Sequence, residues 1–570
     1  MTDRRRSHWG WGYEGQRLTP EQVRAAAGGL AEHLGLGEVE AADPVPLDAA
    51  KLPTPRVAPP AALREFCADD AHARAAHAWG KSYADVVRGF RGDFAYAPDF
   101  VAHPRDERDI ERVLEWCASE RVAAIPYGGG TSVVGGVRPE VDPSYNGTVS
   151  IDLGALRRVL EVDPTSRAAR IQAGASGPEL ERQLGAHGLT LRHFPQSFEL
   201  STLGGWIATR AAGHFATVWT HIEDFVESVR AITPAGVWES RRLPGSGAGV
   251  SPDRMLAGSE GTLGVVTEAW VRVQPPPTHR RAAAVRFADF ARGVECVRAL
   301  SQAGLHPANC RLIDPREARV TLAGDGSCAL LVLGFESPDH AVEEAMARAL
   351  AICREHGGEE EGRRSRGASA PGGGGGGMRT EPGSGGRAES RPPAGAGGGG
   401  GASGAMGGEA VATWREAFLR APYLRDVLVA IGAISETFET AITWERFPAL
   451  HERVTAAAER ALREVGAQPG GVSCRFTHVY PDGPAPYYTV IAQGRRGGEL
   501  EQWAEIKRAV SDAIVDAGGT ITHHHAVGRD HRRWYDRQRP DLFAAALRGA
   551  KAAVDPRGIM NPGVLVEPRR

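Results

Sequence analysis

The stretch PYGGGTSVVGGV, residues 126–137, places five glycines within twelve residues. The preceding residues VAAIPY (Val122–Tyr127) have the composition of a strand, so the glycines are predicted to follow a strand end. A tight turn needs one or two glycines, whereas five leave a run of backbone N–H groups that no Cβ shields. Such a loop can wrap closely around a phosphate group. It is the feature from which we predict the fold.

Two other kinds of phosphate-binding loop are excluded by the surrounding sequence. A nicotinamide-type G-x-G-x-x-G loop must open a helix, but VRPEVDPSYNG (Val137–Gly147) cannot form one. A Walker loop needs Gly-Lys-Ser/Thr after its glycines, and no such lysine is present. We therefore expect a phosphate cradle in a different kind of α/β domain.

Hydrophobic periodicity predicts two folded regions. Residues 108–120 carry apolar side chains at helical spacing after a start signal at Asp106. Strands are predicted over 148–153 and 168–174, and a helix over 177–188. After Pro275–Pro277 the pattern changes to long strands and helices, which indicates a second, α+β domain.

Composition excludes several classes of protein. With 67 basic and 70 acidic residues, the net charge of -3 offers no electrostatic footprint for nucleic acid. No apolar run is long enough to span a membrane, and the N-terminus lacks the apolar core of a secretory signal. The seven cysteines are widely spaced, so neither a disulfide framework nor a structural zinc site is favoured. We expect a cytoplasmic protein with buried free thiols.

The segment 357–409 consists mostly of Gly, Ser, Pro and Arg. It cannot recover its ordering entropy by burying apolar surface. Because patterned sequence resumes on both sides, we expect a disordered insertion that interrupts one domain.

A second cluster of small residues lies in HFPQSFELSTLGGWIATRAAG (His193–Gly213), and a third in MLAGSEGTLGVVTEAWVRVQPPP (Met255–Pro277). Together with the first loop, these stretches resemble the flavin-binding domain of the vanillyl-alcohol oxidase / p-cresol methylhydroxylase (PCMH) family. The resemblance implies that the first loop wraps the FAD pyrophosphate, the second cluster lines the isoalloxazine and the third contacts the adenosine side. The residues expected to bind FAD are Pro126, Gly128, Gly129, Gly130, Thr131, Ser132, Val133, Pro195, Ser197, Ser201, Thr202, Gly204, Gly205, Thr209, Ala211, Ala212, Glu260, Gly261, Gly264, Val265 and Val266. Thr131 stands where covalent members of the family carry a histidine, which implies non-covalent FAD.

Further motifs narrow the resemblance. They are WGWGY (9–13), CRLIDPREA (310–318), YLRDVL (423–428), ISETFETAITWERF (434–447), CRFTHVYPDGPAPYYTV (474–490) and THHHAVG (522–528). Over nearly the whole chain except the insertion, they look like the alkyl-dihydroxyacetonephosphate synthase (alkylglycerone-phosphate synthase) family. The resemblance implies an ether-lipid synthase that exchanges the acyl group of acyl-dihydroxyacetone phosphate for a long-chain fatty alcohol. The exchange is expected to use a flavin N5 adduct with no net redox. A homodimer is also expected, with peripheral membrane contact to collect lipid substrates.

The catalytic residues implied by this resemblance are chemically reasonable. Arg311 and Arg425 stand where the family keeps functional arginines, and guanidinium groups suit a substrate phosphate. His523, His524 and His525 occupy the family's triple-histidine position, where a base that titrates near neutrality can remove a proton next to a carbonyl. Tyr487 matches the family's active-site tyrosine.

Three alternatives compete with the synthase. On a strand, His523 and His525 would share a face and could bind a metal, but zinc takes three or four ligands and no further partner is marked nearby, so we predict no metal. An FAD-dependent oxidoreductase of 2-hydroxy acids would carry G-H-x-G-D-G-N-x-H; His478 matches its first histidine, but Pro486-Tyr487 stand in place of the second. The ending VDPRGIMNPGVL (554–565) is nonetheless closer to that of general oxidases. A non-catalytic flavoprotein would not need the arginine, tyrosine and histidine cluster.

The predicted fold class is α+β. An N-terminal helical cap region is expected over 1–98 and a PCMH-type FAD domain in two α/β subdomains over 99–275. A C-terminal substrate domain is expected over 278–570, with its histidine segment returning to the flavin.

Overall fold

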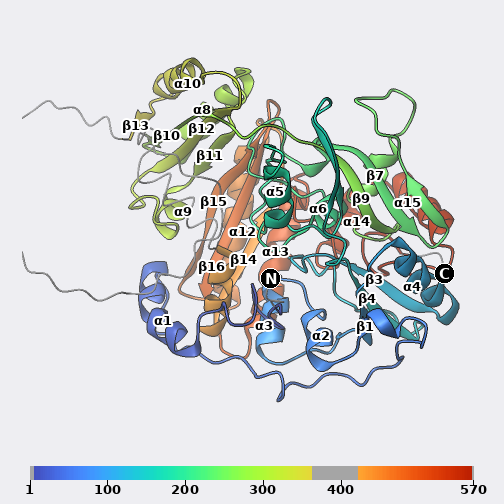
Figure 1. The fold of residues 1–570 in the computed structure, drawn as a ribbon. Helices are drawn as coiled ribbons and strands as arrows, with labels where there is room; N and C mark the ends of the chain where they lie inside the picture. Colours follow the sequence, from blue (N-terminus) through green and yellow to red (C-terminus); the bar gives the residue numbers. More distant parts are fainter. Residues whose placement is uncertain (1–4, 362–420, 568–570) are drawn as a thin grey trace, which may run out of the picture.

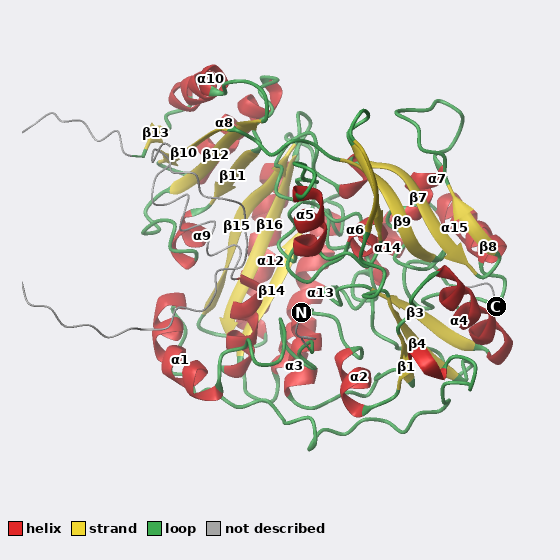
Figure 2. Cartoon of the chain, viewed as in Figure 1, coloured by secondary structure: helices red, strands yellow, loops and turns green. Residues whose placement is uncertain are grey.

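The computed structural model describes residues 5–361 and 421–567 of the chain. These residues form three β-sheets, with helices packed on or between them (Figures 1 and 2). Two of the sheets belong to the N-terminal half and one to the C-terminal half. The α+β prediction is confirmed.

The regular elements of the N-terminal region, before the first strands of the main sheets, are mostly helices. Helix α1 (Pro20–Leu34) begins at a capping box formed by Thr19 and Gln22 and ends at Gly35, whose φ of +67° suits glycine. The remaining elements of this region are α2 (Ala71–Ala76), α3 (Tyr83–Phe90), the 3-10 turn η1 (Arg64–Phe66) and strand β1 (Cys67–Ala68).

The first sheet has four strands in the order β1-β2-β4-β3, and the last three run parallel. Helix α4 (Glu107–Glu120) packs on this sheet through the apolar face predicted from its spacing, with Ile110, Val113 and Leu114 buried. The strands are β2 (Phe100–Ala102), β3 (Val122–Tyr127) and β4 (Gly147–Asp152). Strand β3 runs directly into the glycine stretch, as predicted.

The second sheet is antiparallel, in the order β5-β6-β9-β7-β8. It shares one apolar core with the first sheet, so the two sheets form a single FAD-type unit. Its strands are β5 (Val159–Asp163), β6 (Ala168–Gln172), β7 (Val226–Thr233), β8 (Gly236–Glu239) and β9 (Val265–Arg272). Its helical elements are α5 (Gly177–Gly185), α6 (Leu203–Thr209), η2 (Ile222–Asp224) and α7 (Pro252–Leu256).

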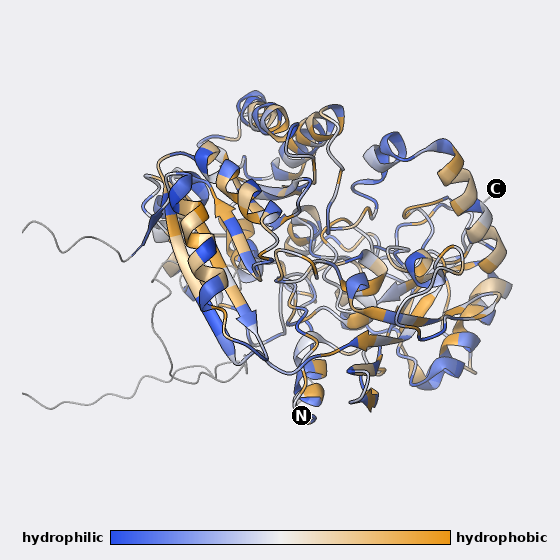
Figure 3. Ribbon diagram, turned by 90° about the horizontal axis from the view of Figure 1, so that it is seen from above, coloured by the Kyte–Doolittle hydropathy of each residue, from blue (hydrophilic) through white to orange (hydrophobic). Residues whose placement is uncertain are grey.

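The third sheet has seven antiparallel strands in the order β13-β10-β12-β11-β15-β16-β14. The strands are β10 (His279–Phe287), β11 (Asn309–Ile313), β12 (Ala329–Ser337), β13 (Glu359–Glu360), β14 (Ala433–Glu439), β15 (Gly470–Val479) and β16 (Pro484–Gln493). Helices α8 (Phe290–Gln302), α10 (Glu343–Glu355), α12 (Phe447–Glu464) and α13 (Glu499–Asp516) share a second core with it, and α9 (Pro315–Val320) packs on β12 and β15. Figure 3 shows apolar residues along these strands and polar residues on the outer helix surfaces.

After α13 the chain leaves the third sheet and returns to the first. Helices α14 (Arg532–Gln538) and α15 (Asp541–Val554) follow a loop, and Asn561 N then donates to Ala124 O of β3 at 2.9 Å. Ile559 and Met560 are fully buried in the core of the FAD-type unit. The loop before α14, which contains the three histidines, therefore crosses between the two halves.

The predicted insertion, 357–409, falls only in its first five residues within the described part of the chain. Residues 359–360 form β13 and pair with β10, and 362–409 lie outside the described residues. Within the described residues, no helix has both the length and the apolar composition to cross a bilayer.

Candidate active site

The glycine loop (residues 126–137) begins at the end of β3 and lies directly against residues 200–202. A Cβ built on Gly129 would lie 2.7 Å from Ser201 Cα and would also collide with the Leu200 carbonyl oxygen. Gly130 has a φ of +67°, which side chains rarely adopt. The structure thus adds a packing reason for these glycines beside the phosphate that the sequence argument invoked.

The same loop presents unpaired donors. The backbone N–H groups of residues 129–133 make no hydrogen bond within the part of the chain that the structure describes. The backbone oxygen of Ser132 accepts from Lys81 N at 2.6 Å, so this contact holds the loop while leaving its N–H groups free. Consecutive free amides are suited to phosphate oxygens, so these residues fit the pyrophosphate of FAD.

The other predicted FAD-binding segments converge on this loop. A Cβ on Gly128 would collide with Thr202 Oγ1, and one on Gly261 would lie 2.9 Å from Pro126 Cγ. Thr202 also caps helix α6 by accepting from Gly205 N. The rest of the second cluster lies in α6 or the loops at its ends: Pro195, Ser197, Ser201, Gly204, Thr209, Ala211 and Ala212.

The residues of the third predicted segment, 260–266, have two different structural roles. Glu260 accepts from Val527 N at 2.9 Å and Gly528 N at 2.7 Å, so its carboxylate holds the loop that follows the histidines. Burial raises the pKa of this carboxyl to about 7. Val265 and Val266 lie in β9 with their side chains in the core, and Gly264, with a φ of +158°, precedes them.

A row of polar side chains crosses one face of the seven-stranded sheet. The strand register pairs Glu439 with Tyr487, Tyr487 with Arg475, and Arg475 with Ile313. Cross-strand partners share a face, and Arg311 lies two residues before Ile313 on that face. We call Arg311, Arg475, Tyr487 and Glu439 the polar sheet face. It is formed from four strands that are distant in the sequence.

The polar sheet face holds two buried guanidinium groups. Arg475 pairs with Glu317 and lies over the Tyr487 ring, 3.9 Å from its centroid. Arg311 is 3% exposed, and Arg311 Nη2 donates to His214 O at 3.2 Å. Burial, followed by the nearby Arg475, lowers the pKa of Arg311 to about 9. The face thus places two guanidinium groups, the donors that suit a carboxylate or phosphate, close to each other.

The three histidines lie in the loop of residues 521–528, which we call the histidine loop, and the expectation that they form a strand is wrong. One buried carboxylate shapes this loop. Glu439 accepts from the backbone N–H groups of His523, His524 (3.0 Å) and His525 (2.9 Å), and from the Thr522 hydroxyl. Three consecutive donors on one carboxylate bend the backbone, so strand-like alternation is lost.

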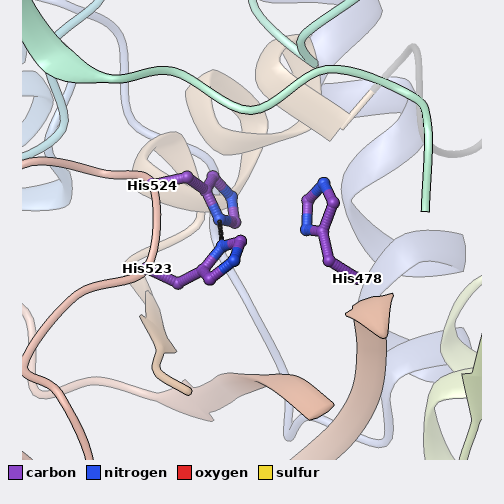
Figure 4. A group of neighbouring side chains, drawn as sticks. All are labelled: His478, His523 and His524. Atoms are coloured by element: carbon purple, nitrogen blue, oxygen red, sulfur yellow. Dashed lines mark hydrogen bonds between the residues drawn. The ribbon is translucent and has the colours of Figure 1, made fainter. Parts of the chain in front are cut away.

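The bend gives the histidines unexpected partners. His523 and His524 point toward each other, with their Nδ1 atoms 3.0 Å apart, and His478 faces them (Figure 4). A register shift between Phe476 and His478 accompanies the placement of His478 beside the loop. Ligand atoms of these three rings lie within 4.8 Å of one another, a spacing that one metal ion could bridge. His525 contacts the His524 ring, with the centroids 4.8 Å apart, but it is not one of these three residues. The expected His523–His525 face is therefore not formed, while the absence of a metal stays a prediction.

Burial keeps these imidazoles neutral. It lowers the pKa of His524 and of His525 to about 3, and that of His523 well below its usual value. For His524, the positive charges of Arg475 and Arg311 lower the pKa further. Neutral imidazole is the form that can accept a proton.

The remaining predicted residues join the same cluster. The Tyr487 ring centroid lies 5.5 Å from that of His525 and 6.1 Å from that of His524. Arg425, in the helical residues 421–430, donates from Nη1 to Lys81 O at 2.6 Å, and Lys81 in turn binds Ser132 of the glycine loop. The structure therefore brings all six predicted catalytic residues together and connects them to the glycine loop.

Several site residues were missed by the sequence argument. Glu439 and Arg475 lie in motifs that carried the resemblance, but no role was assigned to them. Their signal was present, because a charged residue in an otherwise apolar strand is rarely buried without a partner. Thr220, His221 and Tyr480 gave no such signal; they surround His523 only because the chain folds that way.

Comparison with known proteins agrees with this geometry. Residues 98–240 match the FAD binding domain family, and residues 276–370 and 393–565 match the C-terminal domain of FAD linked oxidases. The alkyldihydroxyacetonephosphate synthase of Dictyostelium discoideum is 30% identical over 524 residues, covering 87% of this chain and 78% of that protein. The Trypanosoma brucei brucei protein of the same name is 29% identical over 502 residues, with the same coverage. A solved alkyldihydroxyacetonephosphate synthase structure superposes with a TM-score of 0.75 at 25% identity, covering 99% of this chain and 98% of that one.

Proposed function

This chain belongs to the alkyldihydroxyacetonephosphate synthase family, and we propose that it is an ether-lipid synthase. It would replace the acyl group of acyl-dihydroxyacetone phosphate with a long-chain fatty alcohol and release the fatty acid. One observation carries the proposal: buried arginines and neutral histidines from the seven-stranded sheet and its C-terminal loop converge beside the FAD-binding loops. A protein that only stores FAD would not need this polar cluster.

FAD is the cofactor, and the glycine loop is its expected binding place. When bound, FAD supplies an electrophilic ring system that activates the three-carbon unit without net redox. The loop offers five free amides in residues 129–133 for the pyrophosphate. Thr131 offers no nucleophile comparable to a histidine, which supports non-covalent binding.

The substrate phosphate would bind at the arginines. Arg311 and Arg475 are buried near each other, and Glu317 is the carboxylate that pairs with Arg475. A dianionic phosphate would interact favourably with two guanidinium groups, and charge-assisted hydrogen bonds of this kind contribute about 1.5–3 kcal/mol each. Arg425 approaches from the side of the glycine loop and would help to orient the same group.

Phosphate binding would also prepare the base. Arg475 and Arg311 contribute to the low pKa of His524. A bound phosphate offsets that positive potential, so it would raise the pKa of His524 toward the range in which a base is effective. Proton removal next to the substrate carbonyl would thus be easier with the substrate phosphate bound than without it.

Tyr487 would contact the three-carbon unit of the substrate. Its ring lies between Arg475 and the histidine loop. Burial raises the pKa of its hydroxyl, so the group stays protonated and can donate a hydrogen bond to a substrate oxygen.

Lipid substrates imply contact with a membrane surface, which we propose is peripheral and made by a homodimer in the cytoplasm. Leu542 and Phe543, at the start of α15, expose 86% and 52% of their surface, and they are suited to insert among lipid head groups. Co-sedimentation with vesicles, compared between the wild type and Leu542→Ser/Phe543→Ser, would test this contact. Analytical ultracentrifugation would test the dimer.

The function itself is tested by mixing the FAD-loaded protein, without oxygen, with palmitoyl-dihydroxyacetone phosphate and hexadecanol. Fatty acid release together with formation of the hexadecyl ether would establish the synthase. A parallel sample with D-lactate addresses the oxidoreductase alternative. Flavin bleaching by D-lactate, with no acid released from the lipid, would overturn the proposal.

A further inference from the structure

A chain of hydrogen bonds connects the histidine loop to residues 220 and 221 of the FAD-type unit. His523 Nε2 lies 2.7 Å from the Tyr480 hydroxyl, which lies 3.1 Å from Thr220 Oγ1. Thr220 Oγ1 lies 3.0 Å from His221 Nδ1. His221 Nε2 then lies 3.1 Å from the backbone oxygen of His523, so the chain returns to the residue at which it began.

The last contact, together with a single hydrogen on each imidazole ring, fixes the direction of all the others. A carbonyl oxygen can only accept, so His221 must carry its hydrogen on Nε2. A neutral imidazole that donates at one nitrogen accepts at the other, so His221 Nδ1 accepts from the Thr220 hydroxyl. Thr220 Oγ1 has then used its only hydrogen, and it accepts from the Tyr480 hydroxyl.

The same reasoning continues into the histidine loop. The Tyr480 hydroxyl donates to Thr220, so it accepts from His523 and places the His523 hydrogen on Nε2. His523 Nδ1 then carries no hydrogen and can only accept. His524 Nδ1, 3.0 Å away, must therefore donate to it. Glu439 Oε2, 3.5 Å from His524 Nδ1, favours a hydrogen at that atom as well.

One nitrogen of the histidine loop is thereby left as a free base. With its hydrogen on Nδ1, His524 carries a lone pair on Nε2, and no described residue makes a hydrogen bond to that atom. His523 cannot serve, because both of its ring nitrogens are occupied within the chain.

We propose that Tyr480, Thr220 and His221 are positioning residues that hold His524 in the tautomer with a basic Nε2. They need not touch the substrate; they act through His523. The inference rests on the proposed function for its catalytic meaning, but the tautomer itself is a property of the protein at rest.

Tyr480→Phe tests the proposal by removing the hydroxyl that accepts from His523. His523 can then move its hydrogen to Nδ1, where it opposes the hydrogen on His524 Nδ1 and drives His524 to the tautomer without a basic Nε2. We expect kcat to fall about tenfold or more, since a positioned base contributes about a hundredfold or more, while KM and FAD content stay within twofold. Tyr145→Phe, which removes a buried hydroxyl bonded to Gly558 O away from the site, is the matched control.

A pair of substitutions at Thr220 separates positioning from packing. Thr220→Val keeps the shape and removes the hydroxyl, whereas Thr220→Ser keeps the hydroxyl and removes a methyl group. The proposal expects the valine variant to lose activity and the serine variant to retain it. Equal loss in both variants would indicate packing alone and would overturn the proposal. Full activity in both single variants Thr220→Val and Tyr480→Phe would overturn it as well.

A spectroscopic measurement tests the tautomer without relying on catalysis. Nitrogen NMR of the FAD-loaded protein with 15N-labelled histidine, assigned with His524→Gln, should show His524 protonated on Nδ1 in the wild type and on Nε2 in Tyr480→Phe. A wild-type His524 protonated on Nε2 would overturn the inference. If the NMR result holds and no ether is formed, the proposed function fails while the tautomer assignment stands.

Discussion

The glycine loop and the polar sheet face serve one site by opposite means. The loop contributes backbone amides from one continuous stretch, residues 129–133, and its glycines let it lie against residues 200–202. The polar sheet face contributes charged and aromatic side chains from four strands between Asn309 and Gln493, and the histidine loop adds imidazoles from beyond them. The difference suggests that the loop binds the cofactor and the sheet face determines which reaction follows.

Gly129→Ala is expected to have the largest effect. A Cβ at this position would lie 2.7 Å from Ser201 Cα, so the loop and residues 200–202 must separate. We expect loss of bound FAD and of all activity, measured by flavin absorbance after gel filtration.

Gly185→Ala is the control for that prediction. A Cβ at Gly185 meets nothing within 4 Å, so this variant should retain FAD. Normal FAD content in Gly129→Ala would show that FAD binding does not require the close approach of the glycine loop to residues 200–202.

His524→Ala tests the other side of the comparison. FAD should stay bound, because the glycine loop is untouched, while kcat should fall by about a hundredfold or more through loss of the base. The measurement is fatty acid release from palmitoyl-dihydroxyacetone phosphate, compared with His525→Ala. A larger loss in His525→Ala would transfer the role of base to that residue.

Arg311→Met should act mainly on substrate binding. Loss of one charge-assisted hydrogen bond to phosphate, about 1.5–3 kcal/mol, corresponds to a rise in KM of about tenfold to a hundredfold. Steady-state kinetics with Arg311→Lys as the matched variant would check this, and lysine should restore part of the affinity. An unchanged KM in Arg311→Met would place the phosphate elsewhere.

Glu260→Gln should have the smallest effect, and one that depends on pH. Burial raises the pKa of the Glu260 carboxyl to about 7, above its usual value of about 4.3. The protonated form is therefore favoured in the folded protein, and this contribution to stability is present below about pH 4.3 and lost as the pH rises through about 7. Glutamine cannot ionise, so the melting temperature of the variant should depend less on pH over that range than that of the wild type. The same change of melting temperature with pH in the variant and the wild type would contradict this. Glu120→Gln, on the exposed end of α4, is the control.

Much of the fold was predictable from the sequence because its signals are local. The apolar spacing of Ile110, Val113 and Leu114 identified α4, and the glycines after Tyr127 predicted a bare loop at the end of β3. The six predicted catalytic residues came from resemblance to a family, and the structure brings them together. These parts depend on short stretches that carry their own pattern.

The histidine loop could not be predicted in this way. Its shape depends on Glu439, more than eighty residues earlier, which binds three consecutive backbone N–H groups. The partners of His523, Tyr480 and His221, come from two other segments. No local pattern in THHHAVG predicts these contacts. The assumption of strand alternation led to the wrong expectation that His523 and His525 share a face.

The most direct test of the account is a structure of the FAD-loaded protein with its expected product, hexadecyl-dihydroxyacetone phosphate. The account predicts that the phosphate contacts the Arg311 guanidinium group on the polar sheet face, and that His524 Nε2 faces the carbon next to the carbonyl. A phosphate bound away from the polar sheet face, or His524 turned from the three-carbon unit, would contradict it.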